Sequence, residues 1–280
     1  MGLLFSILLL AAAIYYYQNS KVSKPSLIDE SKNKEHKPTL IDKSTNKENK
    51  SQRKNLKQDE LSEILKFELS EDKTNSKYLV FDTETTGLIK KKSADPQYEP
   101  EKFPFIVQIS WILFDNNEKI IEQHNYLIKQ NKKIPPNSSA IHGITNERTE
   151  KEGLEIKEVL NLFCESLKKT KYVIAHNLDF DWRIFEAELT RNNMSDTKND
   201  KYLFCTMDFG QHFCEIPMYG KDYEYKYPTL EELFHRCFFP DFKYLNMPSV
   251  FHSAYNDTII TAKCFFKMMK IDSLIKSTIK

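Results

Sequence analysis

The chain has 280 residues, of which 40% are hydrophobic, and its formal net charge at pH 7 is +1. This length fits one substantial domain with additional segments, and the near-zero charge means that bulk charge identifies no nucleic-acid binder. Only six glycines are present, without a G-x-G-x-x-G or G-x-x-x-x-G-K-[ST] motif, which disfavours dinucleotide-binding and P-loop folds. Five cysteines without regular spacing favour free thiols in a reducing compartment.

Residues 1–20 contain an uncharged apolar run, which extends from Leu3 to Tyr17. Its length lies between that of a secretory h-region and that of a full membrane span. We predict that residues 1–20 form an N-terminal hydrophobic anchor in a membrane, with a cleaved signal peptide as the alternative. Lysines follow the run and none precedes it, which by the positive-inside rule predicts a single-pass protein whose remainder lies in the cytosol. A secreted or soluble protein is the alternative.

Residues 21–76 are rich in Lys, Asn, Ser and Glu. They include a short tandem repeat, because the pattern of residues 24–29 returns at 37–42. Two copies with little apolar content do not form a solenoid, so we predict a disordered linker. The apolar spacing within residues 57–69 predicts one short helix. The folded domain is predicted over residues 77–280.

This domain is predicted to begin with an antiparallel meander of three strands and to continue with alternating helices and strands. The predicted strands cover 78–81, 105–114, 119–128, 172–175 and 203–204. The predicted helices cover 155–168, 181–191, 229–238 and 254–269, and Thr145 is expected to cap a further short helix. This order predicts an α/β domain with a mixed sheet.

Acidic residues follow or begin three of these core elements. Asp82 and Glu84 end the first strand and point to the same side, because side chains alternate along a strand. Further acids lie in segment 175–181, after a buried strand, and in segment 252–257, at the start of the last helix. Neighbouring carboxylates repel each other unless a cation lies between them. Oxygen ligands with one His suit Mg²⁺ or Mn²⁺ better than Zn²⁺.

The three segments resemble motifs Exo I, Exo II and Exo III of the DnaQ-like, or DEDD, 3′–5′ exonuclease superfamily. The matching patterns are Phe-Asp-Thr-Glu-Thr-Thr-Gly-Leu from Phe81, His-Asn-x-x-Phe-Asp from His176 and His-x-Ala-x-x-Asp from His252. The resemblance covers residues 77–270, with the motifs in the family's order. It implies an RNase H-like three-layer fold with a central mixed sheet flanked by helices. It also implies hydrolysis with two Mg²⁺ or Mn²⁺ ions.

The resemblance assigns five catalytic residues, which are Asp82, Glu84, Asp181, His252 and Asp257. Asp82 would bridge both cations, Glu84 and Asp257 would complete one, and Asp181 would hold the other. His252 would deprotonate the attacking water. Its place five residues before Asp257 is typical of the DEDDh branch.

Asp179 is the alternative to Asp181 as the acid of the second motif. The family pattern selects Asp181, and Asp179 is expected to cap the helix that follows.

The resemblance also implies substrate-binding residues around the first strand. Thr85, Thr86 and Leu88 match the positions that hold the 3′ end of the substrate. His142 lies in a loop, residues 141–145, that resembles the proofreading-subunit branch of the family. Two interpretations of His142 stay open, namely contact with the terminal nucleotide and packing of the loop.

Together these features predict a metal-dependent 3′–5′ exonuclease that releases nucleoside monophosphates from 3′ ends of single-stranded nucleic acid, with DNA slightly favoured over RNA. A 3′–5′ exoribonuclease is one alternative. A catalytically inactive, membrane-tethered nucleic-acid-binding module is another, and the presence of all five catalytic residues argues against it. The expected partners are DNA or RNA 3′ ends and, through residues 1–20, a membrane.

Overall fold

The computed structural model describes residues 53–271, with gaps at 130, 195–200, 219–223 and 249–251. The predicted anchor lies outside the described residues, so membrane attachment stays a prediction. Among the helices that the structure describes, none is both long and apolar enough to cross a bilayer.

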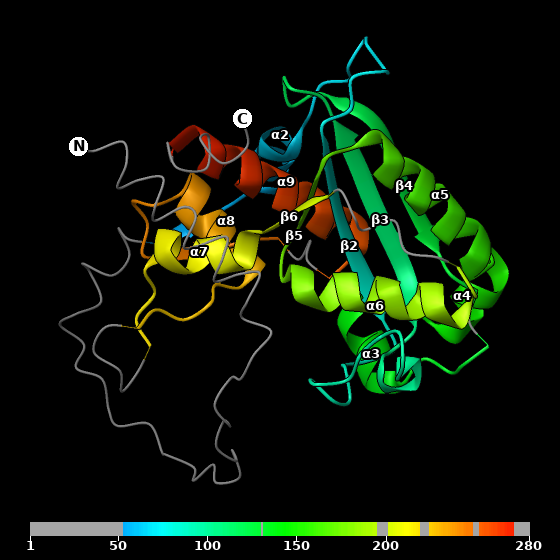
Figure 1. The fold of residues 1–280 in the computed structure, drawn as a ribbon. Helices are drawn as coiled ribbons and strands as arrows, with labels where there is room; N and C mark the ends of the chain where they lie inside the picture. The colour runs from blue at the N-terminus through cyan, green and yellow to red at the C-terminus, as the bar shows by residue number, and fades with distance from the viewer. Residues whose placement is uncertain (1–52, 130, 195–200, 219–223, 249–251, 272–280) are drawn as a thin grey trace, which may run out of the picture. The chain divides into compact units, whose positions relative to one another are not determined.

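A five-stranded mixed sheet forms the centre of the fold (Figure 1), in the order β4-β3-β2-β5-β6. Strands β2, β3 and β4 form the antiparallel meander that the sequence predicts, while β5 and β6 run parallel to β2. The strands are β2 Tyr78–Thr85, β3 Ile106–Phe114, β4 Ile120–Leu127, β5 Tyr172–Ala175 and β6 Tyr202–Cys205.

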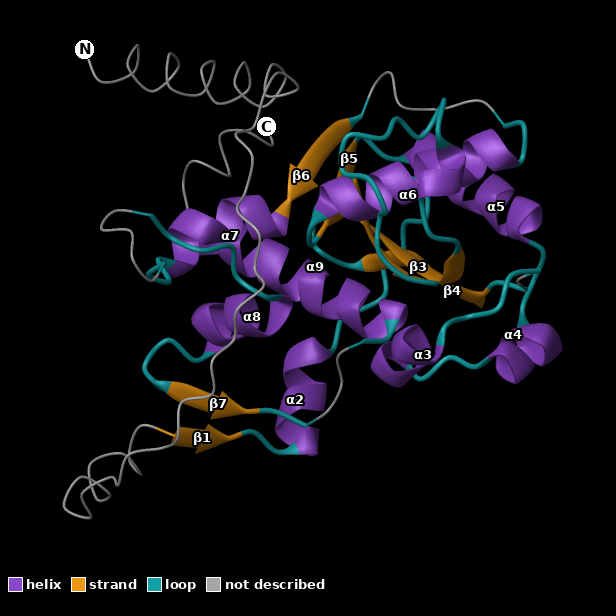
Figure 2. Cartoon of the chain, turned by 90° about the horizontal axis from the view of Figure 1, so that it is seen from below, coloured by secondary structure: helices purple, strands orange, loops and turns teal. Residues whose placement is uncertain are grey.

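Helices cover both faces of this sheet. Figures 1 and 2 show α5 and α6 on one side and α9 on the other, which confirms the predicted three-layer α/β arrangement. The helices are α2 Gln58–Leu65, α3 Pro136–His142, α4 Asn146–Glu152, α5 Ile156–Lys169, α6 Leu178–Arg191, α7 Thr206–Cys214, α8 Leu230–Phe238 and α9 Ala254–Ile271, with a 3₁₀ turn at Pro100–Lys102.

Alternation along β2 divides its side chains between the two helical layers. The ring of Phe81 packs against Phe163 of α5, with ring centroids 5.2 Å apart. Tyr78 faces the other way and packs against Phe265 of α9, at 5.6 Å. Because the side-chain period of a strand is two residues, Asp82 lies on the α9 face.

The folded unit begins before residue 77, so the predicted linker is too long. Arg53–Asn55 forms β1, which pairs in parallel with β7, Tyr244–Asn246. Helix α2 confirms the predicted short helix. Leu56 and Leu61 are buried, which shows why composition alone was misleading. A few apolar side chains fix this Lys- and Glu-rich segment to the domain, whereas an average over residues 21–76 is that of a disordered chain.

The segment before Thr145 is helical where we expected a loop. Helix α3 ends at His142, and Gly143 forms its C-cap in the left-handed region with φ of 70°. Glycine adopts this conformation without a steric penalty, so Gly143 marks the end of a helix within the segment expected to be a loop. Thr145 caps α4 as predicted, because its hydroxyl oxygen accepts a hydrogen bond from the Arg148 N–H at 3.2 Å.

Candidate active site

The end of β2 and the first turn of α9 bring three carboxylates together. Oxygen atoms of Asp82, Glu84 and Asp257 lie within 4.8 Å of one another. Asp82 and Glu84 share one face of β2, and α9 packs across that face and carries Asp257 to it. Among the described residues, no Lys or Arg forms an ion pair with any of the three. Within the described part of the chain, no Lys or Arg side chain therefore neutralises these three carboxylates by an ion pair.

Two polar residues of β3 fix the start of α9 against the sheet. Gln108, which is opposite Glu84 in the strand register, accepts a hydrogen bond from the Ala254 N–H at 3.2 Å. The Thr258 hydroxyl donates to the Ser110 carbonyl oxygen at 3.3 Å. Gln108 was not predicted as a site residue, and its only sequence signal is an amide side chain in a mostly apolar strand.

Asp181 reaches the cluster from the first turn of α6. Its Oδ1 atom accepts hydrogen bonds from the Thr83 N–H at 3.1 Å and from the Thr83 hydroxyl at 2.6 Å. The side chain is almost completely buried. The structure thus places Asp181 beside the other acids, although not within their 4.8 Å group. Thr83 is a further residue that sequence reasoning missed, although it lies between two predicted ligands.

Asp179 does not cap α6, which corrects the prediction. The helix begins at Leu178, and the N-cap position belongs to Asn177, whose φ is 64°. Asp179 therefore lies inside the first turn, where its side chain is 81% exposed and pairs with Arg183 at 3.5 Å. Asp179 points into solvent while Asp181 is buried, so the structure separates the two acids as the family pattern does.

Burial and mutual repulsion raise the pKa values of the four acids. Burial raises the pKa of Asp82 well above its ordinary value, and the charges of the other three acids add to this. Burial raises the pKa of Glu84 to about 8, with further contributions from Asp257 and Asp181. Burial also raises the pKa values of Asp181 and Asp257 to about 7, against the lowering effect of their hydrogen bonds. Ionised acids at this site therefore require a nearby positive charge.

One carboxylate oxygen of Asp257 is suited to act as a metal ligand. Its Oδ2 accepts a hydrogen bond from the His252 N–H at 3.1 Å. Its Oδ1 is buried and has no hydrogen-bond partner among the described residues. A buried acceptor without a partner is costly, and hard divalent cations are bound by carboxylate oxygens of this kind. His252 itself is exposed at the start of α9, with φ of 66°.

Three of the predicted substrate-binding residues, Thr85, Thr86 and Leu88, lie at the end of β2 and in the turn that follows it. The Thr85 hydroxyl donates to the Gly87 carbonyl oxygen at 2.7 Å. The Thr86 N–H donates to the Phe105 carbonyl oxygen at 2.9 Å, and the Thr86 hydroxyl oxygen accepts from the Phe105 N–H at 3.0 Å. Leu88 is 80% exposed. The turn is thus fixed at Thr86 and presents an apolar side chain to solvent.

A buried ion pair on α6 holds the segment that anchors this turn. The Arg191 guanidinium donates to carbonyl oxygens of residues 100, 103 and 104 and lies 4.1 Å from the centroid of the Phe105 ring. Glu188 pairs with Arg191 at 2.9 Å and accepts from the Ile106 N–H at 3.2 Å. Sequence reasoning missed this pair, because its partners are backbone atoms far away along the chain.

His142 lies buried at the end of α3. Its Nδ1 accepts a hydrogen bond from the Ile144 N–H at 3.0 Å. Burial lowers its pKa, although the nearby Thr85 backbone acts in the opposite direction. Its Nε2 is buried and has no hydrogen-bond partner among the described residues. The Nδ1 bond and the proximity of the Thr85 backbone support the packing interpretation, while substrate contact by the buried Nε2 stays a prediction.

This mixed sheet, with acids at the end of its central strand, defines an α/β protein with a carboxylate site of the type that binds divalent cations. The model of the RNase T exonuclease family matches residues 79–265. This match covers more than half of the chain, so the chain belongs to that family and is an enzyme of the nuclease class. The DnaQ-like superfamily inferred from the three motifs is confirmed.

Curated relatives include a subunit of DNA polymerase III and PolC-type DNA polymerases III. DNA polymerase III subunit epsilon of Buchnera aphidicola is 27% identical over 192 residues, which are 68% of this chain and 73% of that protein. The PolC-type DNA polymerase III of Mycoplasmopsis pulmonis is 31% identical over 120 residues, which are 43% of this chain. The match spans only 7% of that polymerase.

Solved structures show the same fold. Exonuclease I of E. coli, crystallised with a dA16 oligonucleotide, superposes with a TM-score of 0.53 at 18% identity. The superposition covers 72% of this chain and 42% of that chain. The expected RNase H-like fold is thereby confirmed.

Proposed function

We propose that the chain is a metal-dependent 3′–5′ exonuclease of the DEDDh type that releases nucleoside monophosphates from single-stranded 3′ ends. The observation that carries this proposal is the convergence of Asp82, Glu84 and Asp257 within 4.8 Å, with Asp181 held beside them by Thr83. Family membership supports the nuclease chemistry. The 3′–5′ direction and the preference for single-stranded DNA are carried over from the motifs.

The four carboxylates fit two Mg²⁺ or Mn²⁺ ions. Their oxygens are the hard ligands that these ions prefer, and the unpartnered Oδ1 of Asp257 supports this donor set. Asp82, Glu84 and Asp257 would hold one ion, and Asp181 would hold the other together with Asp82. When bound, such ions stabilise the attacking and leaving oxygens of a phosphodiester hydrolysis.

His252 is the proposed general base. A His side chain accepts a proton near neutral pH, and His252 is exposed beside Asp257, to which its N–H donates at 3.1 Å. It would take the proton of the attacking water as the new P–O bond forms. The bond between the phosphorus and the 3′ oxygen of the preceding nucleotide would break, so the terminal nucleoside monophosphate carries the new oxygen. The leaving 3′ oxygen takes up a proton, and the shortened strand ends in a 3′ hydroxyl.

The turn after β2 is the proposed seat of the 3′ nucleotide. Thr85 and Thr86 hold the backbone of this turn in place. Leu88, at 80% exposure, would wedge against a base, since apolar and aromatic side chains contact bases without reading their sequence. The buried Nε2 of His142 would contact the terminal nucleotide.

Digestion of end-labelled oligonucleotides tests the proposal. With Mg²⁺, a 5′-labelled single strand should shorten step by step, while a 3′-labelled strand should release labelled mononucleotide at once. Matched RNA and duplex substrates measure the preference, and Asp82→Asn is the inactive control. Release of mononucleotide from the 5′ end, or equal activity of Asp82→Asn, would refute the assignment.

Membrane attachment through residues 1–20 is a separate proposal from the sequence. Comparison of the full chain with a chain that lacks residues 2–20 in a membrane flotation assay would test it. The full chain should float with vesicles, and equal behaviour of the two proteins would exclude the anchor.

A further inference from the structure

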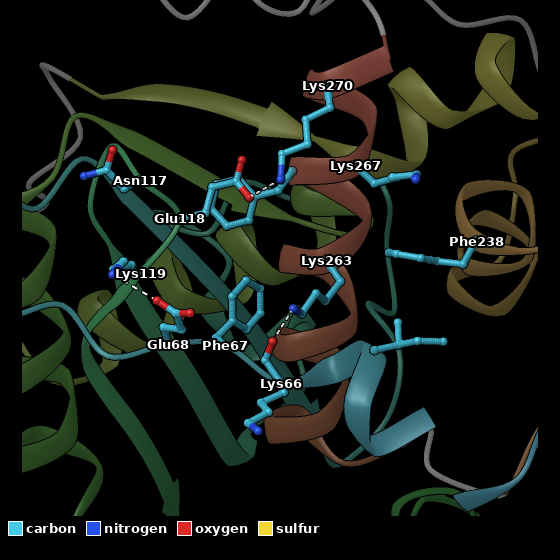
Figure 3. Close-up of a pocket in the computed structure, with 12 residues that line it drawn as sticks. Lys66, Phe67, Glu68, Asn117, Glu118, Lys119, Phe238, Lys263, Lys267 and Lys270 are labelled. Carbon is cyan, nitrogen blue, oxygen red and sulfur yellow. Dashed lines mark hydrogen bonds and ion pairs between the residues drawn. The ribbon is translucent and has the colours of Figure 1, made fainter. Parts of the chain in front are cut away.

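A cavity that none of the four acids lines lies near the C-terminal end of α9 (Figure 3). Its volume is about 490 Å³, and its lining comes from the end of α2 and the residues after it, the β3–β4 turn, the end of α8 and one side of α9. Along the axis of α9, Lys263 and Lys267 of this lining lie about 9 Å and about 15 Å from Asp257, at a rise of 1.5 Å per residue. The cavity is therefore distinct from the proposed active site.

The lining of this cavity is strongly basic. Five lysines and two glutamates line it, so its net charge is +3. Each glutamate is already paired, Glu68 with Lys119 at 2.9 Å and Glu118 with Lys270 at 2.6 Å. Figure 3 shows these two pairs at the rim formed by the β3–β4 turn. Of the three other lysines, Lys66 pairs with Glu63 at 4.0 Å, so the excess charge belongs to Lys263 and Lys267.

Lys263 and Lys267 lack a carboxylate partner within the described part of the chain. The Lys263 ammonium lies 3.7 Å from the centroid of the Phe67 ring and donates to the Lys66 carbonyl oxygen. Burial lowers the pKa of Lys263. The Lys267 ammonium lies 5.7 Å from the centroid of the Phe238 ring. An ammonium group has three donors, so both lysines have hydrogen-bonding capacity for an anion.

We infer that this cavity binds backbone phosphates of a nucleic-acid strand whose 3′ end lies in the active site. The inference rests on the proposed function. Lysines that converge on one cavity are typical phosphate ligands. A stacked strand rises about 3.4 Å per nucleotide, so about three nucleotides reach from Asp257 to Lys263 and about five reach Lys267. Strands too short to reach Lys263 leave the cavity empty, and longer strands bind more tightly.

Binding measurements with two strand lengths test this inference. Fluorescence anisotropy, with the full chain in an Asp82→Asn background that prevents cleavage, would give the affinity for oligothymidylates of about 20 and about 2 nucleotides. Lys267→Gln and the double variant Lys263→Gln/Lys267→Gln should weaken binding of the longer strand by about threefold to tenfold at low salt. Each lost lysine should reduce the salt slope by about 0.7. Binding of the shorter strand should not change.

Lys157→Gln is the matched control, because Lys157 is an exposed lysine on α5, on the other face of the sheet. It should leave both affinities unchanged. Thermal unfolding of each variant tests for damage to the fold. Since Lys263 packs on Phe67, Lys267→Gln alone decides the result if the double variant is unstable. Unchanged affinity for the longer strand, or an equal loss for both lengths, would overturn the inference.

Titrations with free anions test whether the cavity binds phosphate groups from sources other than nucleic acid. Inorganic phosphate and glycerophosphoserine, a lipid headgroup, are titrated into the wild-type chain and the Lys267→Gln variant. If Lys267→Gln weakens either anion and leaves the longer strand unaffected, the cavity does not serve nucleic acid and the inference is wrong.

The outcome also separates this inference from the proposed function. Binding of the longer strand through the cavity lysines without digestion by the wild type would refute the exonuclease assignment alone. Normal digestion together with normal binding by the lysine variants would refute the cavity alone.

Discussion

Both hydrogen-bond donors of Thr83 converge on one oxygen of Asp181, the N–H at 3.1 Å and the hydroxyl at 2.6 Å from Oδ1. Thr83 lies between Asp82 and Glu84 on β2, and its side chain points to the opposite face, where α6 packs. The same strand segment therefore carries two acids on one face and fixes a third from the other. This arrangement sets the spacing of the acids before any cation binds, as preorganised sites require.

Removal of the Thr83 hydroxyl should reduce catalysis more than folding. Thr83→Val keeps the shape and the N–H but loses the bond of 2.6 Å to Asp181. A hydrogen bond to a charged group contributes about 1.5–3 kcal/mol, so kcat should fall by about tenfold to a hundredfold. Thr83→Ser retains the hydroxyl and should stay close to wild type. Steady-state kinetics on a labelled strand measures both, and equal rates for the Val and Ser variants would contradict this role.

Asp82→Asn should stabilise the metal-free chain while it abolishes activity. The substitution removes a carboxyl whose pKa is raised well above its ordinary value by burial and then by the charges of the other three acids, so the free energy of unfolding in EDTA should rise by about 1 kcal/mol. Activity should fall by about a thousandfold or more. Mg²⁺ should stabilise the wild type, because it binds the folded state alone, and should stabilise the variant far less.

Urea unfolding with EDTA and with Mg²⁺ measures these changes. Glu158→Gln, a neutralisation of an exposed acid on α5, is the control and should change neither stability nor activity. If Asp82→Asn lost stability in EDTA, the burial of the Asp82 carboxyl and its repulsion by the other acids would not be the dominant effects.

Arg191→Met should destabilise the domain and weaken substrate binding. The change removes the bonds to the backbone of residues 100–104 and leaves Glu188, 2% exposed, without a cation. Breaking such a pair costs about 3–5 kcal/mol. KM should rise as well, because Phe105, which anchors Thr86, is no longer held by the guanidinium. Urea unfolding and steady-state kinetics measure the two effects.

The double variant Glu188→Gln/Arg191→Met tests the cause of this loss. It removes the unpaired charge and keeps an oxygen for the Ile106 N–H, so it should be more stable than Arg191→Met alone. If the double variant is less stable, the backbone bonds of Arg191 rather than the uncompensated charge dominate.

Periodicity in the sequence was sufficient to place the acids of β2. The period of two along the strand places Asp82 and Glu84 on one face, and the structure has them there with Asp257. The pattern His-Asn-x-x-Phe-Asp selected Asp181 over Asp179, and burial separates these two acids in the same way. The first inference depends on local strand geometry, and the second depends on the resemblance of a short segment to the family pattern.

Contacts between distant segments could not be predicted in this way. Gln108 positions Ala254 across 146 residues of sequence, and no local pattern indicates that a buried amide in one strand is matched to a helix start. The boundary at residue 77 was wrong for a similar reason. The burial of Leu56 and Leu61 depends on the surface that the domain offers, which is absent from the composition of the linker.

His176 should make the domain less stable in acid. Its Nδ1 lies 3.0 Å from the Thr206 hydroxyl oxygen and its Nε2 lies 3.2 Å from the Pro228 carbonyl oxygen. Burial lowers its pKa to about 4 from the ordinary 6.5. The unfolded chain therefore binds a proton between these values while the folded chain does not, so stability is complete above pH 6.5 and is lost as pH falls toward 4.

At pH 5 this loss should be about 2 kcal/mol relative to pH 7 in the wild type. Urea unfolding of the wild type and of His176→Gln at both pH values isolates this contribution. A comparison of pH 5 with pH 7 in the wild type alone is insufficient. The four acids have raised pKa values and therefore stabilise the metal-free chain as pH falls. The variant should be less stable at pH 7, since it loses the fit to Thr206 and Pro228, but it should lose less on acidification. An equal loss in both proteins would show that His176 is not the group that titrates.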